Sequence, residues 1–148
     1  MITSIAHTAY TVTDTQASMR FYRDILGFPF TFGLRGRGEA AEFVYTEDDL
    51  TGVWLLYFKV CPGQFIELFP AGEGRGQPTP GAQTSYQHLC LAVDDIAATV
   101  EEIRAKGWPI ATEPKQGMDG NIQAWITDPD GNRIELMQMM PGSPQYEG

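Results

Sequence analysis

Two stretches of this chain are rough copies of each other, and each copy carries one histidine and one glutamate at matching places. The first copy begins at Ile5 with IAHTAYTVTDTQASMRFYRDILGF and returns later with FIELF; the second begins at Tyr86 with YQHLCLAVDDIAATVEEIRAKGW and returns with RIELM. Each histidine stands seven residues before an aspartate that opens an apparent helix, and each glutamate is framed as Ile-Glu-Leu. The repeated residues are His7, Glu67, His88 and Glu135.

The length of 148 residues predicts one compact domain with a real hydrophobic core. A half of about 65 residues would bury its apolar face poorly alone, so the repeat predicts two halves of one domain rather than two independent domains. We expect a first module at 1–70, a linker rich in glycine and proline at 71–84, a second module at 85–140 and a short C-terminal tail at 141–148.

Charge, hydropathy and cysteine content together argue against several classes of protein. Ten basic and nineteen acidic residues give a net charge of −9, and no cluster of lysine or arginine provides the footprint that nucleic-acid phosphates need. No run of 18 apolar residues predicts a membrane span, and the N-terminal MITSIAHTAY does not resemble a signal peptide. With only Cys61 and Cys90, no disulfide framework is expected. We therefore expect a cytoplasmic protein.

Hydrophobic periodicity predicts the order βαβββ in each half. One helix begins at the N-cap Asp14 and ends at Gly27, and a second covers about 95–106. The predicted strands are 5–12, 40–46, 53–60 and 64–69 in the first half, and 86–93, 110–113, 121–127 and 133–139 in the second. Asp128-Pro129-Asp130-Gly131 predicts the turn between the last two strands. His7 and Glu67 are 60 residues apart whereas His88 and Glu135 are 47 apart, and we place the 13 additional residues in loops around 33–52.

Alternation along the predicted strands places all four repeated residues on the sheet face opposite the helices. Apolar neighbours mark the core side of each strand, namely Ile66, Leu68, Leu89, Leu91, Val93, Ile134 and Leu136. The opposite face would be an enclosed concavity if the strands curl, or open to water if they do not.

A single strand histidine is usually a surface residue, and a single strand glutamate usually marks the wet face of a sheet. Here both histidines of the chain and two glutamates recur in register, so we interpret them as metal ligands. Cys90 lies on the face of His88, but its counterpart in the first copy is Ala9, so we expect it to line a cavity. The glycine-rich segment 33–38 lacks the lysine and the strand-to-helix context of a phosphate loop.

Over roughly residues 4–140 the chain resembles the vicinal oxygen chelate superfamily, and most closely its glyoxalase I branch. The resemblance is carried by HTAYTV around His7, FYRDILGF at 21–28, IEL at 66–68, HLCLAVDD at 88–95 and DPDGNRIEL at 128–136. It implies an α+β fold in which two βαβββ modules form a U-shaped sheet around one divalent metal. It also implies metal ligation by His7, Glu67, His88 and Glu135, and a homodimer in which short members assemble each site between modules of two subunits.

Two imidazoles and two carboxylates suit Zn, Ni, Co, Mn or Fe(II), and they lack the thiolates of a structural zinc site. An octahedral ion with four protein ligands keeps two adjacent positions for substrate oxygens, where it would polarise a carbonyl and stabilise an enediolate. The resemblance implies Glu135 as the base and Glu67 as a second carboxylate that returns the proton or only ligates. The predicted reaction is the isomerisation of a hemithioacetal or similar hydroxy-carbonyl, formally that of lactoylglutathione lyase.

The chain departs from the glyoxalase I pattern at the site for glutathione, the possible co-substrate. That pattern has an asparagine shortly after the fourth-strand IEL, but here IEL runs into FPAGEGRGQ. The candidate partners for the carboxylates of glutathione are Arg35, Arg37, Arg75 and Lys115.

The alternative prediction is an isomerase or epimerase of another small hydroxy-carbonyl or sugar-like substrate. A ring-cleaving dioxygenase or a thiol transferase is expected to use three protein ligands, so the fourth ligand, Glu67, argues against both. A drug-sequestering protein of the bleomycin-resistance type lacks the metal ligands altogether.

Overall fold

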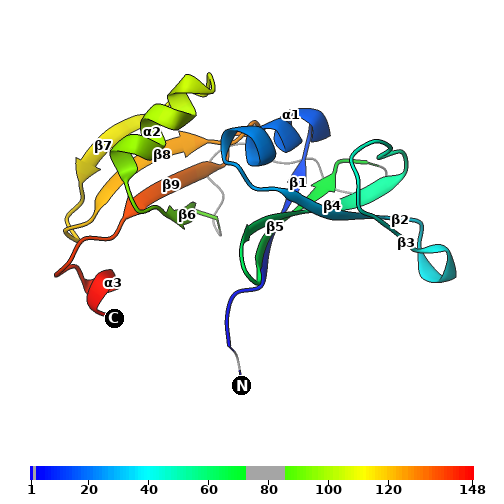
Figure 1. Cartoon of the computed structure of the whole chain (residues 1–148), viewed down its shortest axis with the longest axis horizontal. Helices are drawn as coiled ribbons and strands as arrows, with labels where there is room; N and C mark the ends of the chain where they lie inside the picture. The colour runs from blue at the N-terminus through cyan, green and yellow to red at the C-terminus, as the bar shows by residue number, and fades with distance from the viewer. Residues whose placement is uncertain (2, 73–85) are drawn as a thin grey trace. The chain divides into compact units, whose positions relative to one another are not determined.

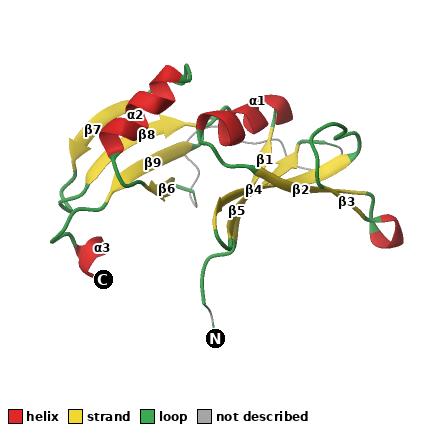
Figure 2. Ribbon diagram, in the orientation of Figure 1, coloured by secondary structure: helices red, strands yellow, loops and turns green. Residues whose placement is uncertain are grey.

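The computed structural model describes residue 1, residues 3–72 and residues 86–148. The chain divides into two compact units, Met1–Pro78 and Thr79–Gly148, and each contains one mixed sheet and its own helices (Figures 1 and 2). Most of the predicted linker at 71–84, including Arg75, lies outside the described residues.

The first unit begins with β1 (His7–Val12), α1 (Thr15–Met19) and a π-helical turn (Arg20–Ile25). It continues with β2 (Phe30–Arg35), a 3-10 turn (Gly38–Ala40), β3 (Glu42–Val44), β4 (Val53–Cys61) and β5 (Gln64–Pro70). The strand order is β1-β5-β4-β2-β3, and β1 runs parallel to β5 while the other pairs are antiparallel.

The second unit comprises β6 (Leu89–Ala92), α2 (Ile96–Ala105), β7 (Thr112–Gln116), β8 (Ile122–Thr127), β9 (Arg133–Gln138) and α3 (Pro144–Glu147). Its strand order is β6-β9-β8-β7, with β6 parallel to β9. The first unit has the same arrangement once the short edge strand β3 is set aside. The predicted α+β class, with one βαβββ module in each half, is therefore confirmed.

One predicted strand of the first half was wrong. The position after the helix is occupied by β2, which was not predicted, and the strand expected at 40–46 is reduced to the three-residue β3 on the sheet edge. Gly33 had suggested a loop, but it lies inside β2, where an added Cβ would meet Val53 Cγ1 at 2.9 Å. Close packing against β4, rather than a turn, explains this glycine. The additional residues of the first half are 36–52, between β2 and β4.

Both helices begin as predicted. The Asp14 carboxylate accepts a hydrogen bond from the Ala17 amide at 3.0 Å, and Asp95 accepts one from Ala98 at 2.9 Å. After α1 the chain widens into the π-helical turn, in which the Leu26 amide donates to the Phe21 carbonyl at 3.0 Å. The wider turn buries two adjacent aromatic side chains, Phe21 and Tyr22.

The core of each unit lies on the helix side of its sheet. The glutamate-bearing strands contribute the buried pairs that alternation predicted, Ile66 with Leu68 and Ile134 with Leu136. The other fully buried large side chains include Val12, Leu56, Phe58, Val100 and Ile126. This burial holds β5 and β9 in a single register, so each intervening glutamate is directed to the opposite sheet face.

The turn between β8 and β9 is built around the buried Asp128. Its carboxylate accepts hydrogen bonds from the amides of Asp130 at 3.0 Å and Asn132 at 2.8 Å, and from Asn132 Nδ2 at 2.8 Å. Gly131 adopts a φ of 83°, and its amide donates to the Asp128 carbonyl at 3.0 Å. This is the predicted turn over 128–131, and it sets the start of β9.

We expect Asp128→Ala to lower the free energy of unfolding by about 2–3 kcal/mol, because hydrogen bonds to a charged group contribute roughly 1.5–3 kcal/mol and their buried donors would lose a partner. Urea unfolding monitored by circular dichroism checks this through a lower midpoint at constant slope. Asp48→Ala, at an exposed position before β4, is the matched control and should stay within about 0.5 kcal/mol of the parent. Equal midpoints for the two variants would contradict the role of Asp128.

Candidate functional site

The first unit brings His7 and Glu67 together. Their strands, β1 and β5, are hydrogen-bonded neighbours, and the register places Ala9 opposite Glu67. His7 Nε2 lies 3.5 Å from Glu67 Oε2. The glutamate is only 7% exposed, whereas 43% of the histidine side chain is accessible. The pair therefore consists of a buried carboxylate beside an imidazole that can be reached from outside this unit.

The second unit repeats this arrangement with His88 and Glu135. His88 immediately precedes β6, and β6 pairs with β9 so that Cys90 stands opposite Glu135. The distance from His88 Nε2 to Glu135 Oε2 is 3.0 Å. Glu135 is only 5% exposed, whereas 35% of the His88 side chain is accessible. The internal repeat thus extends to the geometry of the two histidine–glutamate pairs.

Both carboxylates are buried, and no fixed cation accompanies them among the residues that the structure describes. In the part of the chain that the structure describes, no lysine or arginine forms an ion pair with Glu67 or Glu135. Burying a carboxylate is unfavourable unless a positive charge or hydrogen bonds compensate it. Imidazole nitrogen and carboxylate oxygen are ligands for a divalent ion, which would supply the charge. The donor set therefore fits a metal.

Each unit presents half of the predicted ligand set. Among the described residues, no group of three or more histidine, cysteine, aspartate or glutamate side chains could hold a metal ion by itself. Four ligands would have to come from two pairs.

An aromatic residue accompanies each pair, a feature that was not predicted from the sequence. Tyr57 on β4 is the cross-strand partner of Glu67, and Trp125 on β8 is the partner of Glu135. The Tyr57 ring meets His7 edge to face, with centroids 5.7 Å apart, and Trp125 meets His88 in the same way at 5.0 Å. The signal was present in the sequence, because an aromatic residue stands ten positions before each glutamate.

Each glutamate also has one neutral side-chain donor. The Tyr57 hydroxyl donates a hydrogen bond to Glu67, and burial together with this bond raises the pKa of Tyr57 to about 12. The Cys90 thiol donates to Glu135, and burial together with the nearby Glu135 charge raises the pKa of Cys90 to about 12. Both groups are therefore protonated at neutral pH and act as donors.

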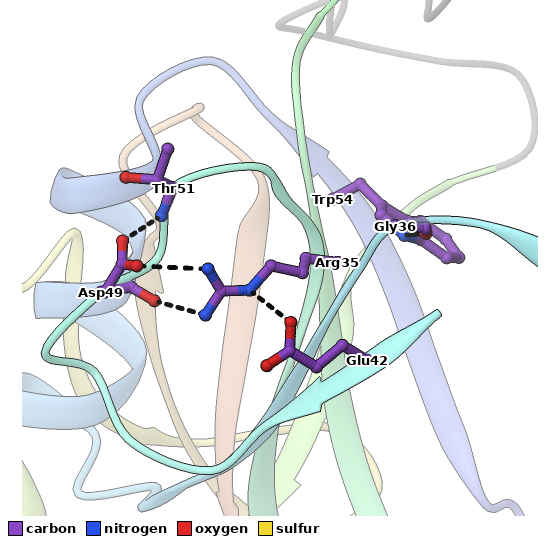
Figure 3. Close-up of polar contacts among 6 residues, drawn as sticks. All are labelled: Arg35, Gly36, Glu42, Asp49, Thr51 and Trp54. Atoms are coloured by element: carbon purple, nitrogen blue, oxygen red, sulfur yellow. Dashed lines mark hydrogen bonds and ion pairs between the residues drawn. The ribbon is translucent and has the colours of Figure 1, made fainter. Parts of the chain in front are cut away.

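Arg35, a predicted substrate contact, is engaged within its own unit (Figure 3). Its Nη1 lies 3.2 Å from Asp49 Oδ2, its Nη2 donates to the Asp49 carbonyl at 3.4 Å, and its Nε lies 3.5 Å from Glu42 Oε2. Hydrogen bonds from Thr51 and Arg35 lower the pKa of Asp49. These contacts tie β2 to β3 and to the loop before β4.

The other two described basic residues that were predicted to contact substrate, Arg37 and Lys115, lie in different units. The Arg37 guanidinium stacks 4.8 Å from the Trp54 ring, whose Nε1 donates to the Gly36 carbonyl at 2.7 Å. Figure 3 shows Trp54 beside Gly36. Lys115 is exposed on β7, opposite Gln123 of β8.

Arg133, which is not among the residues predicted from the sequence, lies two residues before Glu135 on β9 and therefore on the same sheet face. Its guanidinium stacks on Trp125, 4.2 Å from the ring centroid.

A model of the Glyoxalase/Bleomycin resistance protein/Dioxygenase superfamily matches residues 4–136. The chain belongs to this superfamily. Among its relatives, a probable lactoylglutathione lyase of Vibrio parahaemolyticus is 32% identical over 146 residues, which are 97% of this chain and 96% of that protein. The lactoylglutathione lyase of Haemophilus influenzae is 30% identical over 135 residues, 90% of this chain and 91% of that protein.

Solved structures of other proteins share the fold. A glyoxalase/dioxygenase from Nostoc punctiforme superposes with a TM-score of 0.67 at 25% identity, over 93% of this chain and 91% of that one. TnmS3, an antibiotic binding protein from Streptomyces, also superposes with a TM-score of 0.67, at 22% identity over 94% of this chain and 98% of that one. This likeness concerns the fold alone. None of the described helices of this superfamily member is long and apolar enough to cross a membrane.

Proposed function

We propose that this superfamily member is a metal-dependent enzyme of the lactoylglutathione lyase type, which isomerises a hemithioacetal or a similar hydroxy-carbonyl. The observation that carries the proposal is the pair of equivalent histidine–glutamate sites, in which each carboxylate is buried and forms no ion pair with a lysine or arginine among the described residues. The names of relatives at about 30% identity support the same reaction class.

In this proposal His7, Glu67, His88 and Glu135 hold one divalent ion per site, drawn from Zn, Ni, Co, Mn or Fe(II). When bound, the ion would polarise the substrate carbonyl and stabilise the negative charge that develops as a neighbouring carbon loses its proton. Because the two pairs lie in different halves of the chain, a complete site needs both halves. We propose a homodimer in which each site combines the first module of one subunit with the second module of its partner.

The chain's own residues account for the proton transfer. Glu135 removes the proton from the hydroxyl-bearing carbon next to the carbonyl, the hydroxyl hydrogen passes to the carbonyl oxygen, and the first proton is delivered to the former carbonyl carbon, so that atoms and charge balance across an isomerisation. Glu67 remains a ligand or returns the proton. The hydrophobic and aromatic side chains on the Glu67 face, Phe65 and Tyr57, would limit the access of water to the reacting carbon.

A second candidate is the isomerisation or epimerisation of a smaller hydroxy-carbonyl or sugar-like substrate. Two observations favour it: no asparagine follows the IEL of β5, and Arg35 is already engaged by Asp49 and Glu42. For a glutathione substrate, the remaining described basic candidates for its carboxylates are Arg37 and Lys115, to which the structure adds Arg133.

The test combines metal analysis of the purified protein with turnover of the methylglyoxal–glutathione hemithioacetal. We expect about one divalent ion per pair of modules, loss of turnover after chelation, and recovery when the metal is returned, because the ion supplies the main stabilisation of the developing charge. Metal at full occupancy without turnover of the glutathione adduct, but with turnover of small hydroxy-carbonyls, would select the second candidate. A protein that binds no divalent metal would refute both.

A further inference from the structure

We propose that Tyr57 is a positioning residue that fixes the Glu67 carboxylate as a permanent ligand, whereas Glu135 is held weakly enough to leave the ion and act as the base. This inference rests on the proposed function and deepens it, because it identifies the structural feature that distinguishes two carboxylates that the repeat makes look alike.

The two glutamates occupy equivalent places in their sheets. Each lies in the middle of a strand that pairs in parallel with the histidine strand on one side and antiparallel with a neighbour on the other. On the antiparallel side Glu67 faces Tyr57, and Glu135 faces Trp125. Differences between the two pairs therefore come from the side chains at these matching positions, not from the backbone arrangement.

The tyrosine reaches its glutamate and the tryptophan does not. The Tyr57 hydroxyl donates to the Glu67 carboxylate while its ring packs edge to face on His7. The Trp125 Nε1 instead donates to Gln123 Oε1 at 3.1 Å, and the ring contacts both His88 and the Arg133 guanidinium. Two further ring contacts hold Tyr57 in place: it stacks on Phe32 with centroids 4.5 Å apart, and meets Phe65 at 5.8 Å.

On the parallel side, it is Glu135 that has a side-chain donor and Glu67 that lacks one. Cys90 stands opposite Glu135 and donates its thiol hydrogen, whereas the equivalent residue opposite Glu67 is Ala9, which has no donor. Beside its histidine, each carboxylate thus has a neutral donor, an O–H for Glu67 and an S–H for Glu135. A hydroxyl donating to a carboxylate makes a short and strong hydrogen bond, whereas a thiol is a weak donor.

As a consequence, the hydrogen bond that orients Glu67 is stronger than the one that orients Glu135. Hydrogen bonds from the surroundings orient metal ligands, and losing one typically lowers metal affinity or activity by about 10–100-fold. Glu67 is fixed by such a bond from a side chain that is itself locked by three ring contacts. Besides its histidine neighbour, Glu135 is contacted by the weak thiol donor of Cys90, and a weakly held carboxylate can leave the ion to accept a proton from substrate.

The experiment compares Tyr57→Phe, which removes only the hydroxyl and keeps the ring, with Cys90→Ala, which installs the residue found at position 9. Tyr45→Phe, in which an exposed tyrosine loses its hydroxyl, is the matched control. Cobalt(II) affinity is measured by chelator competition, and the visible absorption spectrum of the cobalt-loaded protein reports the geometry around the ion. Turnover of the hemithioacetal by the parent protein is measured in parallel.

We expect Tyr57→Phe to weaken cobalt affinity by about tenfold or more and to alter the visible spectrum. Cys90→Ala should change the affinity by less than about threefold, because a thiol is a weak donor, and Tyr45→Phe should match the parent. If the parent binds cobalt and turns over substrate but Tyr57→Phe has the same affinity and spectrum, the inference is wrong and the proposed function stands. An effect of Cys90→Ala as large as that of Tyr57→Phe also overturns the inference. A parent protein that binds no cobalt refutes the proposed function, and the inference with it.

Discussion

Glu135→Gln should remain slow even when its metal site is saturated. If Glu135 is the base, an amide cannot accept the substrate proton, and the loss of a general base lowers turnover by about 10²–10⁴-fold. Glu67→Gln should be much milder under the same conditions, because an amide oxygen can still ligate the ion. The measurement is kcat for the hemithioacetal at increasing metal concentration, so that loss of occupancy is separated from loss of chemistry.

The two variants control for each other, since both glutamates are buried at equivalent strand positions beside a histidine. Each substitution removes one charge and keeps the side-chain shape. Equal losses at full occupancy would contradict the assignment of Glu135 as the base. Recovery of both variants by added metal would leave neither residue as the base and would limit both to ligation.

Mixing two inactive variants should restore activity if each site is shared between subunits. His7→Ala and His88→Ala should each lose metal binding and turnover, because each deletes a ligand from every site. In a mixed dimer of the two, one site would carry both defects and the other would carry none. Random assortment then predicts recovery of about one quarter of the parent turnover. The variants are produced together in one cell, and turnover and bound metal are measured on the purified mixture.

The control mixture combines His7→Ala with Glu67→Ala, whose defects lie in the same module. Every site in that mixture has one damaged first module, so no recovery is expected. Absence of recovery in the His7→Ala and His88→Ala mixture would contradict shared sites and favour a site completed within one chain. A monomer by light scattering that holds metal at full occupancy would lead to the same conclusion.

Local sequence patterns determined most of the fold and all four candidate ligands. Strand alternation assigned each glutamate to the face opposite the buried isoleucine and leucine pairs, and burial of Ile66, Leu68, Ile134 and Leu136 agrees with it. The caps Asp14 and Asp95, and the turn at 128–131, were readable because their hydrogen bonds join residues only a few positions apart. The repeat then supplied the pairing of each histidine with its glutamate, which adjacent strands confirm.

Only the tertiary structure decided the features that depend on contacts between distant segments. Gly33 looks like a loop residue until β4 is placed against it, and Arg35 looks available until Asp49 and Glu42 are brought to its guanidinium. The roles of Tyr57 and Cys90 follow from cross-strand register, which sets the atoms that a side chain can reach. Strand alternation determines the face of a residue from its own neighbours, but a hydrogen bond across a sheet depends on the strand that packs beside it. For this reason the internal repeat makes the two carboxylates look equivalent, whereas the folded sheets give them different neighbours.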